Sequence, residues 1–154
     1  MKPHRIRESI WLPLSPESVF PFFADVRNMQ RITPRELDFR ILNPLPIEMK
    51  KGAIVDYRLR LYGIPFRWRS EITQWEPPRN FVDEEIFGPY GMWVHTHNFW
   101  PEGEGTVVED DILYRLPFLP FGEMAFPLVR AELKRILSYR RRMIGELLIP
   151  RDHP

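Results

Sequence analysis

The feature that most constrains the fold is a long stretch, residues 37–114, in which apolar and polar residues alternate. Segment 55–61 alternates Val, Tyr, Leu and Leu with Asp, Arg and Arg, and segment 66–72 repeats the pattern. A period of two is typical of strands that bury one face and expose the other. Gly and Pro turns separate the segments after Leu61, Glu76 and Trp100. Because short turns join antiparallel neighbours, the stretch predicts an antiparallel meander.

The flanking segments add one strand and three helices. Residues 5–14 alternate like the later strands, and Ser15 followed by Pro16 is typical of a helix start. A second short helix is expected over 25–31, and residues 126–148 carry a helical apolar stripe. We therefore predict a single α+β domain over 1–154, with 149–154 as a tail. It combines a curved antiparallel sheet of about seven strands, two short helices after the first strand and one long C-terminal helix.

The composition excludes several classes of protein. The 22 basic and 21 acidic residues nearly cancel, so we expect no nucleic-acid partner. The sequence has no cysteine, which excludes disulfides and thiolate metal sites. No apolar run has the length of a membrane span, and the first residues lack the apolar core of a signal peptide. We expect a cytoplasmic protein without stable membrane insertion. The apolar residues Phe118, Leu119, Phe121 and Phe126 are compatible either with a lid or with a homodimer contact.

The segment GPYGMWVHTHNFW, residues 88–100, holds two histidines that share one face of a strand. If Tyr62 pairs with Pro65, the next strands align so that Leu61 faces Phe66 and Leu59 faces Trp68. If Trp75 pairs with Asn80, then Ile72, Ser70 and Trp68 face Asp83, Glu85 and Phe87. An odd number of residues in the following loop places Asp83 across from His97, and Glu85 across from His95.

This register gives the sheet a polar patch on its concave face. The inward residues are expected to be Phe81, Asp83, Glu85, Phe87, Trp93, His95, His97 and Phe99, with Val108, Asp110, Ile112 and Tyr114 on the last strand. A buried carboxylate is costly unless it is paired, so each acid and histidine would satisfy the other. Arg140 interrupts the apolar stripe of the long helix, and either reaches this patch or extends to solvent.

Three functions are compatible with such a patch. The first is a polar anchor in a cavity that binds a small amphipathic ligand. The second is catalysis, in which His95, His97, Asp83 and Glu85 are the candidate general acids and bases of a cyclisation or dehydration. The third is a metal site on His95 and His97. We favour binding without chemistry, and expect no resident metal or cofactor because no third histidine is evident.

Several motifs give the chain a family resemblance. The sequence contains PLSPESVFPFFAD at 13–25, ITP at 32–34, FVDEE at 81–85, GPYGMWVHTHNF, DILYRLPF and ILSYRRR. With the order of elements, these resemble the helix-grip fold of the START-like (SRPBCC) superfamily, in its small bacterial polyketide cyclase/dehydrase-like branch. The resemblance covers essentially the whole chain.

The resemblance implies a hydrophobic cavity between the sheet and the long helix, which holds a lipid, sterol, polyketide or other apolar molecule. It brings no fixed catalytic triad, and the fold serves many unrelated functions. Together with the predicted faces, it gives a set of expected ligand-contacting residues: Trp68, Ser70, Asp83, Glu85, Trp93, His95, His97, Phe99, Asp110, Tyr114, Leu133, Ile136 and Arg140.

Overall fold

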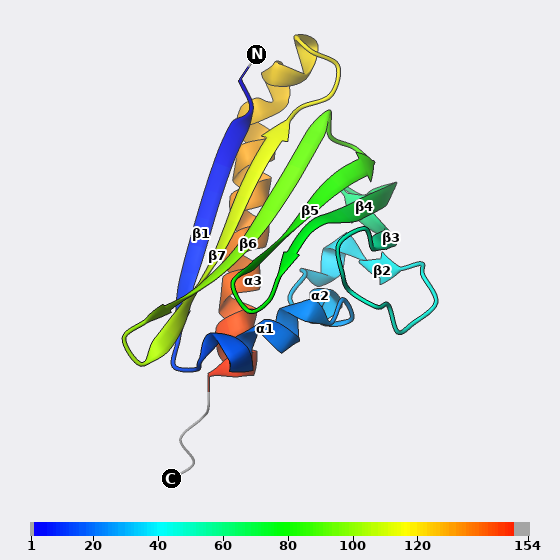
Figure 1. The fold of residues 1–154 in the computed structure, drawn as a ribbon. Helices are drawn as coiled ribbons and strands as arrows, with labels where there is room; N and C mark the ends of the chain where they lie inside the picture. The colour runs from blue at the N-terminus through cyan, green and yellow to red at the C-terminus, as the bar shows by residue number, and fades with distance from the viewer. Residues whose placement is uncertain (1, 150–154) are drawn as a thin grey trace.

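The computed structural model describes residues 2–149, and the end of the expected tail, 150–154, lies outside this range. All strands belong to one antiparallel sheet in the order β1-β7-β6-β5-β4-β3-β2 (Figure 1). Their bounds are β1 His4–Leu12, β2 Arg40–Ile41, β3 Ile54–Leu61, β4 Ile64–Glu76, β5 Asn80–Phe87, β6 Met92–Glu102 and β7 Gly105–Arg115. The predicted meander over β3 to β7 is confirmed, and the first strand closes the sheet against the last.

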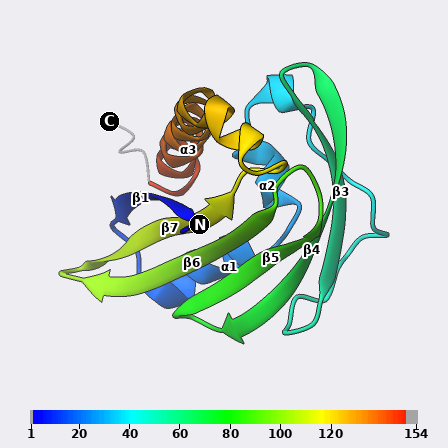
Figure 2. The same ribbon diagram turned by 90° about the horizontal axis from the view of Figure 1, so that it is seen from above.

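The helices lie on the concave side of this sheet. They are α1 Pro16–Ala24, α2 Asn28–Arg31 and α3 Phe126–Leu148, with single-turn 3-10 helices η1 Arg35–Leu37 and η2 Phe121–Ala125. Viewed from above, α3 lies over β1 and β7, while the sheet curls away toward β3 and β4 (Figure 2). Ser15 caps α1 by accepting a hydrogen bond from the Ser18 amide. The predicted α+β helix-grip architecture is confirmed.

The β3–β4 hairpin differs from the predicted register by two residues. Leu61 pairs with Ile64 and Leu59 with Phe66, so Tyr57 rather than Leu59 faces Trp68. The reason is the turn, which contains only Tyr62 and Gly63, both with positive φ (53° and 75°). Two such residues form the tight turn that suits the twist of a hairpin. Because the shift is even, every side chain still points to its predicted face.

Two short elements are smaller than predicted. The helix expected over 25–31 is a turn followed by the four residues of α2, and the strand expected over 37–41 shrinks to β2. Asp38 takes a left-handed conformation (φ 44°) directly after η1, which delays the start of the strand. Both differences arise from turn geometry that the alternation pattern does not reveal.

The core occupies the space between the concave face and the helices. The part beside α1 holds Phe20, Phe23, Ile72, Phe81 and Phe99, all at most 7% exposed. Toward the other end, Leu133 and Leu137 of α3 pack on Ile112 and Tyr114 of β7. Within residues 2–149, no helix combines the length and apolar character needed to cross a bilayer.

Candidate functional site

The two histidines of β6 lie on the concave face as predicted, but their partners differ. The cross-strand neighbour of Asp83 is His95, and that of His97 is Phe81. The predicted pairs Asp83–His97 and Glu85–His95 are therefore shifted by two residues along β5. The last paired residues of β5 and β6 are Glu84 and Val94, and nine residues, 85–93, separate them in the chain. This odd number keeps the predicted faces, although the register is wrong. On β4, Ile72–Asp83 and Ser70–Glu85 pair as predicted, but bulges shift the flanking pairs, so Asn80 opposes Glu76 and Phe87 opposes Arg69. The predicted inward position of Phe87 is therefore wrong, because the one-residue bulge turns it outward, where it is 63% exposed.

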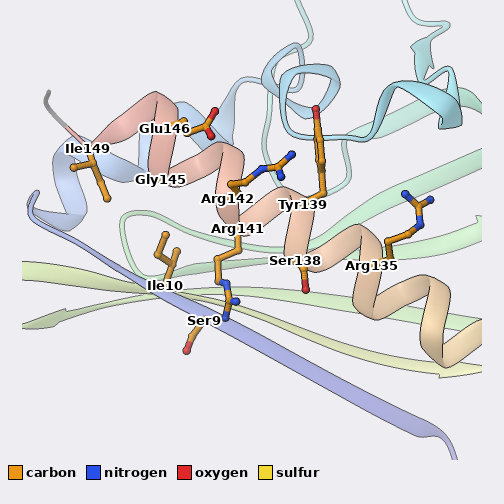
Figure 3. Close-up of a pocket in the computed structure, with 10 residues that line it drawn as sticks. All are labelled: Ser9, Ile10, Arg135, Ser138, Tyr139, Arg141, Arg142, Gly145, Glu146 and Ile149. Atoms are coloured by element: carbon orange, nitrogen blue, oxygen red, sulfur yellow. The ribbon is translucent and has the colours of Figure 1, made fainter.

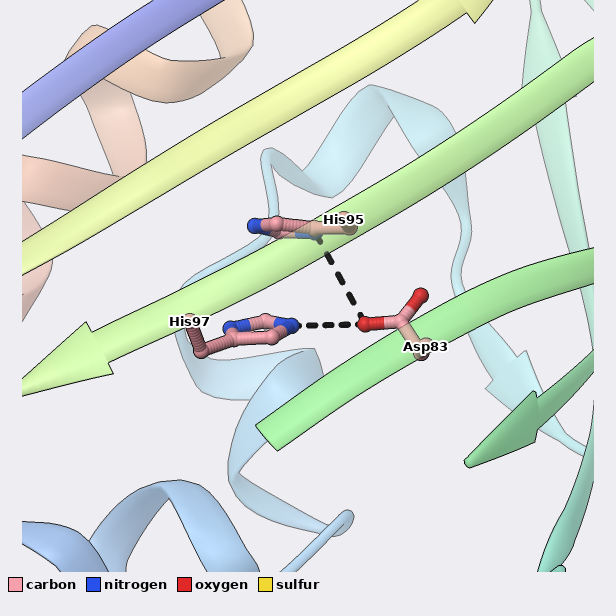
Figure 4. A group of neighbouring side chains, drawn as sticks. All are labelled: Asp83, His95 and His97. Carbon is pink, nitrogen blue, oxygen red and sulfur yellow. Dashed lines mark hydrogen bonds and ion pairs between the residues drawn. The ribbon is translucent and has the colours of Figure 1, made fainter. Parts of the chain in front are cut away.

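Asp83 still reaches His97 diagonally across the strands. Its Oδ2 lies 2.6 Å from His97 Nε2, and 3.9 Å from Nδ1 of His95 (Figure 4). The two imidazoles stack with centroids 3.8 Å apart, and Phe81 stacks on the other side of His97 at 4.0 Å. Because an ionised carboxylate only accepts hydrogen bonds, His97 Nε2 carries the proton that Asp83 accepts.

Asp110 of β7 anchors the other side of the pair. Its Oδ1 accepts a hydrogen bond from His95 Nε2 at 2.8 Å, and its Oδ2 accepts one from Arg140 Nε at 2.9 Å. A second guanidinium nitrogen of Arg140 lies 3.5 Å from His97 Nδ1. Arg140 therefore reaches the predicted patch rather than solvent, and is 8% exposed. The five residues form one buried network that joins three strands to α3.

Burial and charge both act on the ionisation of this network. Burial, with the neighbouring His95, lowers the pKa of His97 to about 4, although Asp83 opposes the shift. The pKa of Asp110 lies below its usual range because Arg140 and His95 outweigh the cost of burial. The pKa of Asp83 is also lowered: burial opposes ionisation, but His97 and His95 together outweigh it. A neutral His97 that donates from Nε2 and accepts from Arg140 at Nδ1 fits these directions.

A small cavity adjoins the network. Its volume is about 40 Å³, and it lies between the concave face and the α1–α2 segment. Its apolar lining includes Phe22, Met29, Met49, Tyr57 and Phe81, and its polar lining comprises Asp25, Asn28, Ser70, Asp83, His97 and Arg140. A cavity of this size holds water molecules but not a drug-sized ligand, which needs about 300–1,000 Å³.

Four of the predicted ligand-contacting residues line this cavity: Ser70, Asp83, His97 and Arg140. His95 and Asp110 lie directly behind them. The remaining seven do not line the cavity. Phe99 packs on Phe20 and Phe23, Leu133 packs on β7, and Ile136 is half-buried on α3. The other four lie on the concave face outside the cavity: Trp68, Trp93, Tyr114 and Glu85. The missed residues come mainly from the α1–α2 segment and Met49, whose packing onto the sheet has no signature in the sequence.

Glu85 has a different environment from the one predicted. Its Oε1 accepts a hydrogen bond from the Tyr90 amide at 3.1 Å, whereas its buried Oε2 has no partner among residues 2–149. Burial raises the pKa of Glu85 to about 7. Around it, Trp68 packs edge-on against Trp93 at 5.1 Å, and Tyr90 packs on Trp93 at 4.7 Å. These rings fill the concave face at the end of the sheet near Glu85.

A metal ion has a possible set of ligands in Asp83, His95 and His97. One ligand atom from each residue lies within 4.8 Å of the other two. However, the rings stack at an interplanar angle of 25°, so their lone pairs run side by side instead of converging. The 2.6 Å separation of Asp83 Oδ2 and His97 Nε2 is that of a hydrogen bond; two ligands about 2.0–2.1 Å from one zinc ion lie further apart. The arrangement fits a hydrogen-bonded network better than a metal centre.

A second, open groove lies between β1 and α3 (Figure 3). It is lined by Ile10, Gly145 and Ile149 together with basic residues of the helix. Those cations already have neighbours, because Arg141 pairs with Glu8 at 3.2 Å and the Arg142 guanidinium lies over the Tyr139 ring at 5.2 Å. Of the run Arg140–Arg142, only Arg140 therefore faces the interior.

The comparisons with known proteins agree with this architecture. Residues 3–140 match the sequence profile of the family described as "Polyketide cyclase / dehydrase and lipid transport". The chain belongs to this family. The match spans the whole sheet and most of α3, so it includes every residue of the buried network. No curated protein matches the chain.

Several solved structures share the fold of this polyketide cyclase/dehydrase and lipid transport family member. A protein of Thermus thermophilus superposes with a TM-score of 0.75 at 19% identity, covering 93% of this chain and 95% of its own. A protein of Chromobacterium violaceum gives 0.75 at 14% identity, with 97% and 100% covered. A START superfamily protein from Mycobacterium smegmatis gives 0.67 at 13% identity, with 94% and 99% covered. At such identities the likeness extends to the fold, and the predicted START-like resemblance is confirmed at that level.

Proposed function

We propose that this protein binds a small, largely apolar ligand in the cavity beside Asp83, and that the ligand's polar group is a hydrogen-bond donor such as a hydroxyl. One observation supports this most directly. Asp83 Oδ1 takes no hydrogen bond, and Ser70 Oγ has no partner, among the described residues that surround the cavity. Of these two atoms Ser70 Oγ is the buried one; a buried polar atom without a partner costs about 1–3 kcal/mol, so a ligand hydroxyl at this point would recover that cost.

The charge of the network supports a donor over an anion. Asp83, whose lowered pKa keeps it ionised, lines the cavity, and its negative charge would repel a ligand carboxylate placed beside it. A hydroxyl or amine would instead donate to Asp83. The aromatic and aliphatic wall would hold the rest of the ligand through apolar burial.

The cavity must enlarge to accept such a ligand, and the wall most able to move is the one away from the sheet. Met29 and Met49 have flexible, unbranched side chains that repack readily. Met29 lies on the four-residue helix α2, which has no side-chain N-cap, and Met49 lies on the connection between β2 and β3. We infer that the ligand enters between these two segments. Toward the sheet, Tyr57 lines the cavity and stacks on Trp68 at 5.6 Å, so a larger ligand would meet this aromatic pair next.

Binding can be tested with small probes that differ only in their polar group. Native mass spectrometry of the purified protein would first reveal any co-purified ligand. Calorimetric titration should then show that 1-naphthol binds more tightly than naphthalene and 1-naphthoate. Ser70→Val should weaken naphthol binding by roughly five- to ten-fold, the value of one hydrogen bond, and leave naphthalene unchanged. The matched control is Ser9→Val, the same change at an exposed position of β1. Equal affinity for all three probes, or no binding of any, would show that the donor proposal is wrong.

The alternative function is a cyclase or dehydratase that uses an acid–histidine pair. The buried Asp83–His97 pair beside a cavity favours it, but both nitrogens of His97 already face partners, so neither is free to exchange a proton with a substrate. We therefore rank binding first. The His95→Ala and His97→Ala variants separate the two: turnover of a polyketone substrate that both variants abolish, with folding intact, would reverse this ranking.

A further inference from the structure

The outer face of the sheet carries a row of arginines that directly oppose one another. Arg40 on β2 pairs across the ladder with Arg58 on β3, and Arg58 pairs with Arg67 on β4. Like charges in directly opposed positions destabilise a sheet. Asp38 lies 3.2 Å from Arg40, but Arg58 and Arg67 have no ion pair among residues 2–149. Two of the three arginines in the row therefore have no ion-pair partner among the described residues.

The carboxylates nearest to Arg58 and Arg67 already pair with other arginines. Arg60 lies 4.0 Å from Asp38, which already faces Arg40, and Asp56 is taken by Arg69 at 2.8 Å. A hollow of about 530 Å³ lies at the two unpaired arginines, and Leu42, Pro65 and Phe66 complete its lining. Such a hollow, with apolar walls and two free guanidinium groups, fits an anionic group attached to an apolar molecule.

The end of the molecule next to this row exposes large apolar side chains. On the β3–β4 turn, Tyr62 and Ile64 are 54% and 57% exposed. In and after the loop that follows β7, Phe118, Phe121 and Met124 are 85%, 76% and 84% exposed. The Tyr62 hydroxyl donates to the Leu128 carbonyl at 3.5 Å, which joins the β3–β4 turn to the start of α3, just after η2. Soluble monomers seldom concentrate so much exposed apolar surface unless it contacts a partner.

The spacing between the apolar tip and the arginines is that of a membrane interface. At about 3.3 Å per residue, Arg60 lies roughly 7 Å from Tyr62, and Arg67 lies roughly 10 Å from Ile64. Interfacial segments bury their apolar face about 5–10 Å below the headgroups. Apolar residues at this depth would leave the guanidinium groups level with lipid phosphates.

We propose that this end of the protein docks on the surface of an anionic lipid bilayer, with the tip residues Tyr62, Ile64, Phe118, Phe121 and Met124 inserted and Arg58, Arg60 and Arg67 on the headgroups. A bilayer matches both the apolar and the charged part of the surface. A second copy of the chain matches less well, because a two-fold contact through this face would bring its arginine rows together. The docking is peripheral and reversible, and it does not depend on which ligand the internal cavity holds.

Co-sedimentation with vesicles tests this directly. The protein should pellet with vesicles of phosphatidylcholine that contain about one third phosphatidylserine, and much less with phosphatidylcholine alone. Removing the charge of two arginines, as in Arg58→Gln with Arg67→Gln, should weaken binding to the anionic vesicles about 25-fold, since each contributes about five-fold. The matched control is Lys51→Gln with Arg79→Gln, which removes two exposed charges away from this end. It should bind like the original protein.

The apolar part is tested by Phe118→Ser with Phe121→Ser. These side chains are mostly solvent-exposed, so the variant should fold normally while its binding to both kinds of vesicle falls. Higher salt should weaken the original protein's binding but not abolish it, because only the arginine contribution is screened. The proposal is overturned if the protein does not pellet with anionic vesicles, or if both charge variants lose binding equally. It is also overturned if sedimentation shows a dimer that the Phe118 and Phe121 substitutions disrupt while vesicle binding persists.

Discussion

Asp110 on β7 and Arg140 on α3 form a buried ion pair with a separation of 2.9 Å. Their positions are 30 residues apart in the sequence, and the pair connects the long helix to the polar centre of the sheet. The same carboxylate also accepts a hydrogen bond from His95, so this one contact orients the whole network.

Removing one partner of the pair should be strongly destabilising. In Arg140→Met the Asp110 carboxylate stays buried without its cation, which is expected to lower the free energy of unfolding by about 3–5 kcal/mol. Urea denaturation would measure the loss. Arg142→Met, two residues along α3 and exposed, should change stability little. The double variant Arg140→Met with Asp110→Asn should recover part of the loss; no recovery would mean that Arg140 stabilises through packing rather than charge.

The ionisation of His97 gives a prediction that NMR can check. Because burial and His95 lower the pKa of His97 to about 4, its ring should stay neutral well below the normal titration range of an imidazole. In the unfolded chain His97 binds a proton near pH 6.5, so its contribution to stability is lost as the pH falls from about 6.5 to 4. A chemical shift of a His97 ring carbon that changes with a midpoint near pH 6.5 in the folded protein would contradict this prediction.

Glu85 should act in the opposite direction. Its pKa is raised to about 7 by burial, so the folded state holds a proton that the unfolded state releases above about pH 4.5. Stability should therefore decline as the pH rises from about 4.5 to 7. Glu85→Gln removes this decline and should be the more stable protein at pH 8, by about 1 kcal/mol after allowance for partial exposure. If the free energy of unfolding of the two proteins changes with pH in the same way, Glu85 is not responsible for the decline.

Two glycines offer a contrast that tests the packing around β1. A Cβ on Gly105 would collide with the Leu12 carbonyl and the Trp11 ring, so Gly105→Ala should separate β1 from β7 and cost about 1–3 kcal/mol. A Cβ on Gly145 would make only van der Waals contacts, with Ile10 Cδ1 at 3.4 Å and Ile149 Cδ1 at 3.7 Å. Gly145→Ala should stabilise α3 by up to about 1 kcal/mol. Thermal unfolding of both variants would measure the two signs, and a loss at Gly145 would show that β1 cannot accommodate the added methyl group.

Much of the architecture could be predicted because it follows from local periodicity. The alternation in β3 to β7, the Ser15 cap and the stripe of α3 each depend on neighbours in the sequence. The registers were wrong by two residues at two places, since each depends on the number of residues in a turn rather than on the strand pattern. An even error keeps the faces, which explains why Asp83, His95 and His97 were still predicted to meet.

The sequence by itself therefore determined the fold class, the buried face of each strand except at the Phe87 end of β5, and the set of polar residues on that face. The tertiary structure decided which acid serves which histidine, and it brought Arg140 to Asp110. It also decided where the cavity lies, because the α1–α2 segment and Met49 close over Ser70 and Asp83 from distant parts of the chain. Periodicity records which side of an element is apolar, whereas partner choice depends on turn lengths and on the packing of separate elements, which no single segment encodes.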